Sequence, residues 1–248
     1  MASLTCRLLP FAEVDGFHNM AADETMLESA MNGIASLRFY TWSVPTVSLG
    51  YFQPAAARDQ DPLLAQLPFV RRPTGGDAIV HHWETTYALA LPPGLQWQGK
   101  EPWPQRIHGI IVLALAKFGL TAGLLDSQSL RNRARPESTL CFQHVTACDV
   151  VSGESKIVGS AQRRRKGALL QHGSILMAKS PFAPALPGIL ELSGQALTVA
   201  DVCSAVAAEF RKQTAWYVKP SDWTDEERRR TDELVECKYR QENWNRKR

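Results

Sequence analysis

The chain has 248 residues, of which 44% are hydrophobic and 21% are charged, and its formal net charge is +3. This composition is ordinary for a globular protein, and so small a net charge gives no argument for nucleic acid binding. The N-terminal segment carries Glu13 and Asp15 and has no long apolar run, which excludes a signal peptide or a membrane span there. No linker or internal repeat divides the sequence, so we expect one domain over residues 1–248, located in the cytoplasm.

Apolar periodicity predicts helices at about 19–31, 104–118, 199–212 and 225–241. Thr198 with Asp201, and Thr224 with Glu227, have the spacing of capping boxes that begin the last two helices. Strands are expected through much of 36–91 and in a hairpin around 156–177. The expected fold class is therefore mixed α/β (α+β) with largely antiparallel strands.

A glycine-rich segment, Arg71-Arg72-Pro73-Thr74-Gly75-Gly76-Asp77, lies between two apolar runs and is predicted to be a loop between strands. It is not a Walker loop, because no Gly-Lys-Ser/Thr follows. It is not a dinucleotide fingerprint either, because a strand rather than a helix comes next. A Gly-Gly pair taken alone is equally explained by a turn that needs positive φ.

The five cysteines, at positions 6, 141, 148, 203 and 237, form no CxxC pair and leave an odd count. Neither a disulfide framework nor a zinc ribbon is indicated, and a reducing compartment is expected. Cys6, Cys203 and Cys237 fall in predicted strands or helices, where cysteine usually packs as a small apolar residue.

Cys141 differs from the other cysteines because it ends a polar segment in which Arg131, Arg133 and Arg135 come shortly before it. Nearby cations favour a thiolate, so Cys141 is the candidate nucleophile. Cys148 is the alternative, although it precedes an apolar strand and is expected to pack.

The predicted hairpin has apolar runs at 157–161 and 168–177 on either side of a charged turn, Arg163-Arg164-Arg165-Lys166-Gly167. The small residues Gly159, Ser160 and Ala161 leave room for a backbone or a slender ligand. Lys156 begins the first strand, either as a solvated strand-end charge or as a functional group. The turn arginines are either solvated or form a basic rim that steers acidic proteins, and no nucleic acid recognition motif accompanies them.

Three histidines, His81, His144 and His172, share neither ligand spacing nor carboxylate partners, so no metal site is expected.

Ordered segments along nearly the whole chain resemble the lipoate/biotin protein ligase superfamily. They are N-M-A-A-D-E-T-M-L at 19–27, T-V-S-L-G-Y-F-Q at 46–53, R-R-P-T-G-G at 71–76, H-x-x-E-x-T-Y at 81–87, K-I-V-G-S-A-Q at 156–162, L-Q-H-G-S-I-L at 170–176 and K-Y-R-Q-E-N-W-N at 238–245. The resemblance implies a class II aminoacyl-tRNA synthetase/biotin ligase-like core, in which one central, largely antiparallel mixed sheet carries an acyl tunnel and is flanked by helices. It also implies that the C-terminal accessory domain of many lipoate ligases is absent.

Within this superfamily the chain is most similar to the cysteine-dependent octanoyltransferases that use acyl carrier protein as donor. E-T-T-Y at 84–87 and L-C-F at 140–142 carry that likeness. It implies that Cys141 forms an acyl thioester, and that Lys156 orients the acyl carbonyl, stabilises its developing charge and takes a proton from the incoming amine. The implied substrate-binding residues are Arg72, Thr74, Gly75, Gly76, His81, Gly159, Ser160, Ala161, His172 and Gly173.

The implied acceptor is a lysine on a lipoyl domain of a 2-oxoacid dehydrogenase or on the glycine cleavage H protein. No cofactor, metal, nucleic acid or membrane is implied. The chain departs from the family pattern at Asp77, His82, Val145 and Cys148. ATP-dependent lipoate ligation, octanoyl amidotransfer between lipoyl domains and non-catalytic acyl binding remain as alternatives, and chain-length preference, donor, acceptor and oligomeric state stay open.

Overall fold

The computed structural model describes residues 4–95, 101–126 and 145–247. Within these ranges nine strands form one mixed sheet in the order β12-β1-β3-β7-β11-β10-β9-β8, with β2 added beside β3. Their bounds are β1 Thr5–Leu8, β2 Ala12–Val14, β3 Ala35–Trp42, β7 Glu84–Leu91, β8 Gly123–Leu124, β9 Val150–Ser152, β10 Ser155–Arg165, β11 Ala168–Leu176 and β12 Tyr217–Pro220.

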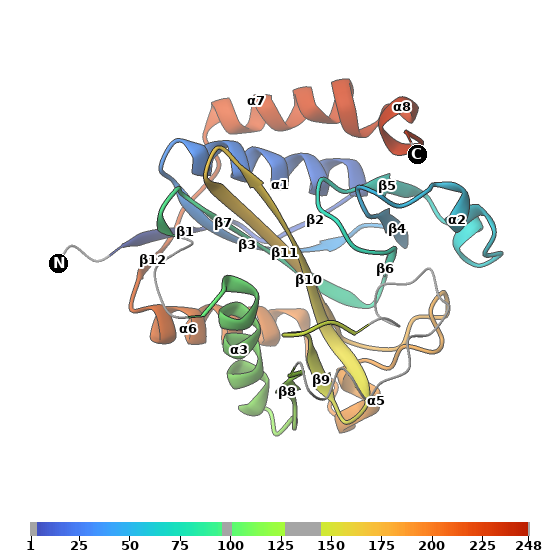
Figure 1. The fold of residues 1–248 in the computed structure, drawn as a ribbon. Coiled ribbons are helices and arrows are strands. Elements are labelled where there is room, and N and C mark those ends of the chain that lie inside the picture. The colour runs from blue at the N-terminus through green and yellow to red at the C-terminus, as the bar shows by residue number, and fades with distance from the viewer. Residues whose placement is uncertain (1–3, 96–100, 127–144, 248) are drawn as a thin grey trace.

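Helices cover both faces of this sheet (Figure 1). Helix α1, Gly16–Met31, lies on one face with α7, Asp225–Leu234, outside it, while α3, Trp103–Ala116, and α6, Val199–Thr214, lie on the other face. Alternate residues of each central strand therefore enter different cores. In β7, Tyr87 and Leu89 pack with α3 and α6, whereas Ala88 and Ala90 pack with α1.

A second, three-stranded sheet lies beside the N-terminal end of α1. Strand β4, Thr46–Leu49, pairs in parallel with β5, Phe69–Arg71, and antiparallel with β6, Ile79–His81. The shorter helices are α2 Ala56–Asp59, α5 Ile189–Ser193 and α8 Glu242–Asn245, with a 3-10 turn at Leu64–Gln66 and a π-helical turn at Val235–Tyr239. The family resemblance implied one central sheet, so this separate sheet was not anticipated.

All four predicted helices are present, and the largely antiparallel mixed sheet flanked by helices is confirmed. Helix α1 begins earlier than expected because the side chain of Asp15 accepts a hydrogen bond from the backbone N–H of His18 at 2.9 Å. Both predicted capping boxes form, at Thr198 and at Thr224. The last helix changes to π-helical geometry after Leu234.

The hairpin is confirmed, but its predicted turn was too long. Only Lys166 and Gly167 make the turn, with φ values of 48° and 80°. Two successive residues of positive φ match the right-handed twist of paired strands, so β10 and β11 continue up to the turn. Arg163, Arg164 and Arg165 are therefore exposed residues of β10 rather than residues of the turn.

The cysteine predictions were partly right. Cys6 is buried in β1, Cys203 is half-buried in α6, and Cys237 is exposed, contrary to expectation. Cys141, His144 and the arginines at 131, 133 and 135 lie outside the described residues. Among the residues that the structure does describe, no helix is both long and apolar enough to span a membrane.

Candidate active site

A narrow cavity of about 40 Å³ lies between α1, the α1-facing side of the large sheet and the small sheet. Met20 and Tyr40, which are 2% and 0% exposed, are its most deeply buried apolar lining residues. Seven predicted site residues line the cavity. On the side of the small sheet they are Arg72, Gly76 and His81, and from the hairpin they are Ser160, Ala161, His172 and Gly173. The structure thus brings together predicted residues from four of the sequence segments that were singled out.

The glycine loop, residues 71–77, connects β5 to β6 as predicted. The buried guanidinium of Arg72 donates hydrogen bonds to the carbonyls of Ser48 at 2.8 Å, Gly75 at 2.7 Å and Asp77 at 2.7 Å. Arg72 therefore shapes the loop from within. Gly50 is required beside it, because a Cβ at that position would lie 1.7 Å from the carbonyl oxygen of Gly76.

Arg71, at the start of the loop, is fully buried and joins it to the C-terminal segment. Its guanidinium donates to the carbonyl of Asn245 at 2.8 Å and to those of Gly50 and Gln53, each at 2.7 Å. Its backbone N–H donates to Oδ1 of Asn245 at 2.8 Å. The indole of Trp244 returns a hydrogen bond to the Arg71 carbonyl at 2.9 Å. Helix α8 therefore fixes the end of β5 from which the loop departs.

Lys156 is buried rather than solvated, with 5% of its surface exposed. Its Nζ lies 2.9 Å from Oδ2 of Asp149, whose side chain is itself almost fully buried. The same Asp149 oxygen accepts hydrogen bonds from the backbone N–H and the hydroxyl of Thr146, at 2.6 Å and 3.0 Å. The solvated strand-end alternative for Lys156 is therefore excluded.

Gly159 determines where the Lys156 side chain lies. A Cβ at position 159 would be 2.5 Å from Cε and 2.8 Å from Nζ of Lys156, so the ammonium rests over the glycine backbone. Side chains alternate along a strand, which places the missing side chain of Gly159 on the same face as Ala161. Because Ala161 lines the cavity, the ammonium lies on the cavity's side of β10.

Two buried histidines at the cavity are each held between a carboxylate and a hydroxyl. His172 Nδ1 lies 2.7 Å from Asp23 Oδ2, and its Nε2 lies 2.6 Å from the hydroxyl of Thr74. His81 Nδ1 lies 3.0 Å from Glu84 Oε1, and its Nε2 lies 2.8 Å from the hydroxyl of Ser48.

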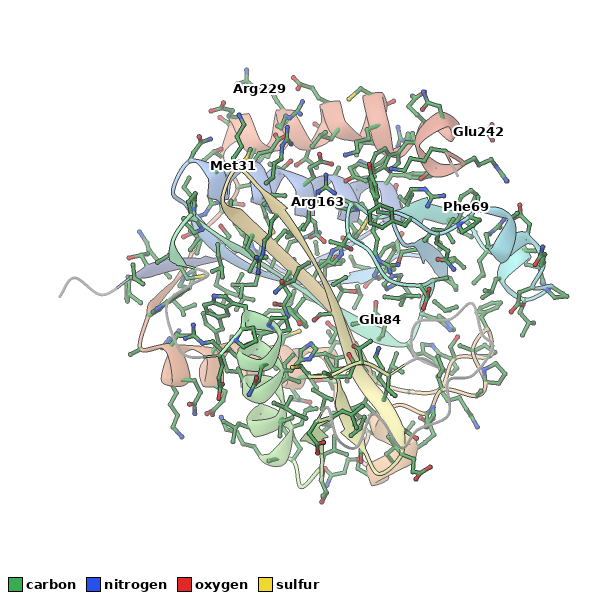
Figure 2. All side chains as sticks on the ribbon, in the orientation of Figure 1. Met31, Phe69, Glu84, Arg163, Arg229 and Glu242 are labelled. Atoms are coloured by element: carbon green, nitrogen blue, oxygen red, sulfur yellow. The ribbon has the colours of Figure 1, made fainter. Side chains whose placement is uncertain are left out.

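The ring of His81 is also fixed by stacking on Trp42, with centroids 3.8 Å apart. Burial lowers the pKa of His81, against the opposing influence of the Glu84 carboxylate, so this imidazole is favoured in its neutral form. Figure 2 shows Glu84 in the interior, at the start of β7.

Three of the described cysteines, Cys6, Cys148 and Cys203, are poor thiolates. Burial raises the pKa of Cys148, and the carboxylates of Asp149 and Glu101 raise it further. Burial also raises the pKa of Cys203 to about 11 and that of Cys6 to about 12. Cys148 adopts φ 72°, which is unusual for a residue with a side chain. The raised pKa disfavours Cys148 as the nucleophile.

Sequence reasoning missed the carboxylates that hold the functional side chains, Asp23, Glu84 and Asp149. Asp23 and Glu84 lie inside the motifs quoted above. Asp23 follows the apolar run Met20-Ala21-Ala22 in α1, which is a usable signal because a carboxylate that is buried with such a run needs partners. Within the described segments, no group of three or more His, Cys, Asp or Glu side chains comes together as a metal site would.

Known proteins resemble this chain in sequence over nearly its full length. The octanoyltransferase LipM of Symbiobacterium thermophilum is 33% identical, with 96% of this chain and 97% of the relative covered. The LipM of Kyrpidia tusciae is 32% identical, with 97% and 98% covered.

Solved structures share the fold. A bipartite lipoate protein ligase from Thermoplasma acidophilum, studied with its E2 lipoyl domain, superimposes with a TM-score of 0.72 at 22% identity, covering 99% of this chain and 97% of the other. LipL1 of P. falciparum, in complex with lipoate, superimposes with a TM-score of 0.70 at 14% identity, covering 98% and 74%.

The family described as the lipoyl protein ligase A/B catalytic domain matches residues 15–211, which include α1, the glycine loop, both buried histidines and Lys156. That match extends over most of the chain, and the sequence relatives agree with it. The chain belongs to the lipoyl protein ligase A/B catalytic domain family.

Proposed function

We propose that this protein is an acyltransferase of protein lipoylation, which transfers an octanoyl group to the target lysine of a lipoyl domain. We further propose that octanoyl-acyl carrier protein is the donor, that Cys141 carries the acyl group as a thioester, and that the reaction takes place in the cytoplasm. Support comes from relatives named octanoyltransferase along 96% of the chain and from a related fold studied with an E2 lipoyl domain.

One observation carries the proposal: the buried ammonium of Lys156 lies over Gly159, on the face of β10 from which Ala161 lines a narrow cavity. An acyl chain that enters from this side would point its methyl end toward Met20 and Tyr40. Each buried methylene contributes about 0.8 kcal/mol, so a slender chain gains affinity along its whole length. Its carbonyl would then stay on this side, near the ammonium.

In the first half-reaction the Cys141 thiolate attacks the carbonyl carbon of the donor thioester. A new C–S bond forms, the bond to the carrier's sulfur breaks, and the carrier thiolate leaves. Exchange of one thioester for another is nearly balanced, so the step needs no ATP. Lys156 donates a hydrogen bond to the oxygen on which negative charge develops.

In the second half-reaction the acceptor amine attacks the acyl-enzyme. A C–N bond forms, the C–S bond to Cys141 breaks, and the departing thiolate accepts the amine's proton. The ion pair with Asp149 leaves Lys156 as an ammonium, which has no lone pair. This arrangement supports an electrostatic role for Lys156 over the proton-accepting role implied by the resemblance.

The test is incubation with octanoyl-carrier protein alone, followed by intact mass and peptide mapping. We expect a hydroxylamine-labile octanoyl group on Cys141, which then passes to an added lipoyl domain without ATP. Cys141→Ser should abolish transfer, while the matched change Cys148→Ser should retain it. Loss of transfer in Cys148→Ser with normal transfer in Cys141→Ser would reverse the assignment.

A second arm separates transferase from ligase by energy source. Free octanoate or lipoate, supplied with ATP and the acceptor domain, should give little modification. Strong ATP-dependent modification that survives Cys141→Ala would identify a lipoate ligase instead.

A further inference from the structure

Asp23, His172 and Thr74 form a buried relay that joins α1, β11 and the glycine loop at the wall of the cavity. Their exposed fractions are 0%, 5% and 1%. Asp23 Oδ2 lies 2.7 Å from Nδ1 of His172, and Nε2 of His172 lies 2.6 Å from Oγ1 of Thr74. No chemistry proposed above requires Asp23, and yet it is completely enclosed.

The partners of Asp23 are hydrogen-bond donors, as a carboxylate requires. Arg38 donates to its Oδ1 at 3.2 Å, and the hydroxyl of Tyr40 donates to its Oδ2 at 2.7 Å. A buried carboxylate with a cationic donor and a hydroxyl donor is stabilised in its charged form. An ionised carboxylate only accepts hydrogen bonds, so Nδ1 of His172 must carry a proton.

The tautomer of His172 then sets the direction of the next hydrogen bond. In the neutral imidazole with a proton on Nδ1, Nε2 holds a lone pair and can only accept. To a neutral His172 in this tautomer the Thr74 hydroxyl donates, which fixes the Thr74 side chain in one orientation. The backbone carbonyl of Thr74 is engaged as well, because it accepts from the N–H of Tyr51 at 2.8 Å.

A second relay, Glu84–His81–Ser48, holds the same loop through a different residue. Its terminal hydroxyl, that of Ser48, accepts a hydrogen bond from Arg72 at 3.2 Å. The first relay therefore fixes Thr74 through a histidine bound to a carboxylate. The second fixes Arg72 in the same way, through the Ser48 hydroxyl. Such buried chains of hydrogen bonds favour one arrangement of the groups that they connect.

We infer that Asp23 is a positioning residue, which acts through His172 to fix the Thr74 hydroxyl and thereby the glycine loop against the cavity. The role in catalysis rests on the octanoyl transfer proposed above. The relay itself does not depend on the reaction, because its hydrogen bonds exist without an acyl group.

The substitution Asp23→Asn tests the relay because the site dictates how the amide must turn. Arg38 lies at the Oδ1 position, whereas His172 and Tyr40 both lie at Oδ2. The amide oxygen should face Arg38 and the amide NH2 should face His172. An NH2 donor at Nδ1 forces the imidazole proton to Nε2, so that Thr74 becomes the acceptor.

The first measurement is the tautomer of His172 by 15N–1H NMR of the protein without substrate. We expect a proton on Nδ1 in the wild type and on Nε2 in Asp23→Asn. Tyr40→Phe is the matched control, because it removes the other hydrogen bond at Oδ2 but keeps the carboxylate, and the wild-type tautomer should persist. A proton on Nε2 in the wild type would overturn the inference even if Asp23→Asn does not fold.

The second measurement is kcat/KM for octanoyl transfer. Thr74→Val removes the hydroxyl at nearly constant shape, and we expect a loss of about tenfold, typical of one buried hydrogen bond. Asp23→Asn should cost a similar factor, and the double variant should lose little more, because both changes break the same relay. Thr74→Ser, which restores a hydroxyl, should recover part of the loss. Fully multiplicative losses would show that the two residues act separately and would overturn the inference.

The two measurements distinguish the possible failures. If the wild type transfers no octanoyl group, the proposed function fails and so does the catalytic role of Asp23, whatever the tautomer. If transfer is normal but the tautomer is opposite, only the relay is wrong.

Discussion

Gly159 is a residue whose contribution lies in the side chain that it lacks. We predict that Gly159→Ala lowers octanoyl transfer by about 100-fold, the scale of losing a positioned electrostatic group. The physical reason is that the added Cβ would lie 2.5 Å from Cε of Lys156 and displace the ammonium. Single-turnover acylation of Cys141, followed by intact mass, measures the effect.

The matched control is Gly109→Ala in α3, where an added Cβ meets nothing within 4 Å. This variant should fold and transfer octanoyl groups normally. The substitution of Gly by Ala should stabilise helix α3 by up to about 1 kcal/mol. Equal activity of both alanine variants would show that the position of Lys156 does not matter.

Lys156 and Asp149 give the next residue-scale prediction. Lys156→Met should reduce transfer by at least ~100-fold and should also lower the melting temperature, because it leaves the buried Asp149 carboxylate without its cation. The double variant with Asp149→Asn should recover much of the melting temperature but none of the activity. Recovery of activity together with stability would mean that Lys156 acts only in folding.

At this scale the sequence identifies site residues better than it identifies their partners. Short motifs with small or cationic side chains pointed to the hairpin and the glycine loop, and seven of the predicted residues line the cavity. The partner of His172 could not be predicted, because Asp23 lies 149 positions away along the chain. Only the packing of α1 against β11 brings the two together.

Among the elements, the attachment of α7 gives a prediction about pH. Burial alone would raise the pKa of Glu227, but hydrogen bonds from Arg7 and Ser29 and from the Thr224 backbone lower it from 4.5 to about 2. A depressed pKa in the folded state contributes stability above pH 4.5, and that contribution is lost as the pH falls toward 2.

We therefore expect Glu227→Gln to lower the melting temperature at pH 7, and the difference from wild type to close between about pH 4.5 and pH 2. Glu226→Gln, at an exposed position of the same helical turn, is the control and should change little at any pH. A constant difference down to pH 2 would show that charge is not what Glu227 contributes.

Helices were predicted more accurately than strand connections, for a local reason. Capping residues such as Thr198 and Thr224 lie within three positions of the backbone groups that they satisfy, so they can be recognised in the sequence. The hairpin turn depends on positive φ at Lys166, which the arginine run concealed. The separate small sheet depends on a parallel pairing of β4 with β5, which local patterns do not encode.

Charge on the whole molecule gives the last prediction, because the arginines of β10 form an exposed basic strip. Arg163 lies 5.3 Å from the ring of Tyr51, which directly precedes exposed Phe52, and Arg165 lies 3.3 Å from Glu28. If the strip steers acidic carriers, changing residues 163–165 to serine should lower kcat/KM for carrier-bound octanoate at low salt. The wild-type rate should also fall with added salt, because screening shortens the field to about 8 Å at physiological ionic strength.

Two comparisons make this test specific. Turnover of a small octanoyl thioester should be nearly unchanged in the triple variant, since a neutral small molecule is not steered. Arg229→Ser removes an exposed charge that points away from the molecule on the outer helix (Figure 2), and it should leave the carrier reaction as it was. Equal rates for the triple variant and wild type at low salt would leave the strip as ordinary solvated surface.

The contact between Arg71 and Asn245 has a consequence for how the chain folds during its synthesis. Their hydrogen bonds span 174 positions, so the end of β5 lacks this attachment until residue 245 has been synthesised. Contacts between such distant positions form late in folding, because the entropy of closing a long loop is lost before the contacts stabilise the chain. A growing chain can therefore form much of its large sheet before the glycine loop gains its hydrogen bonds to the C-terminal segment. The support that α8 gives to the glycine loop would therefore be added after most of the strands of the large sheet have been synthesised.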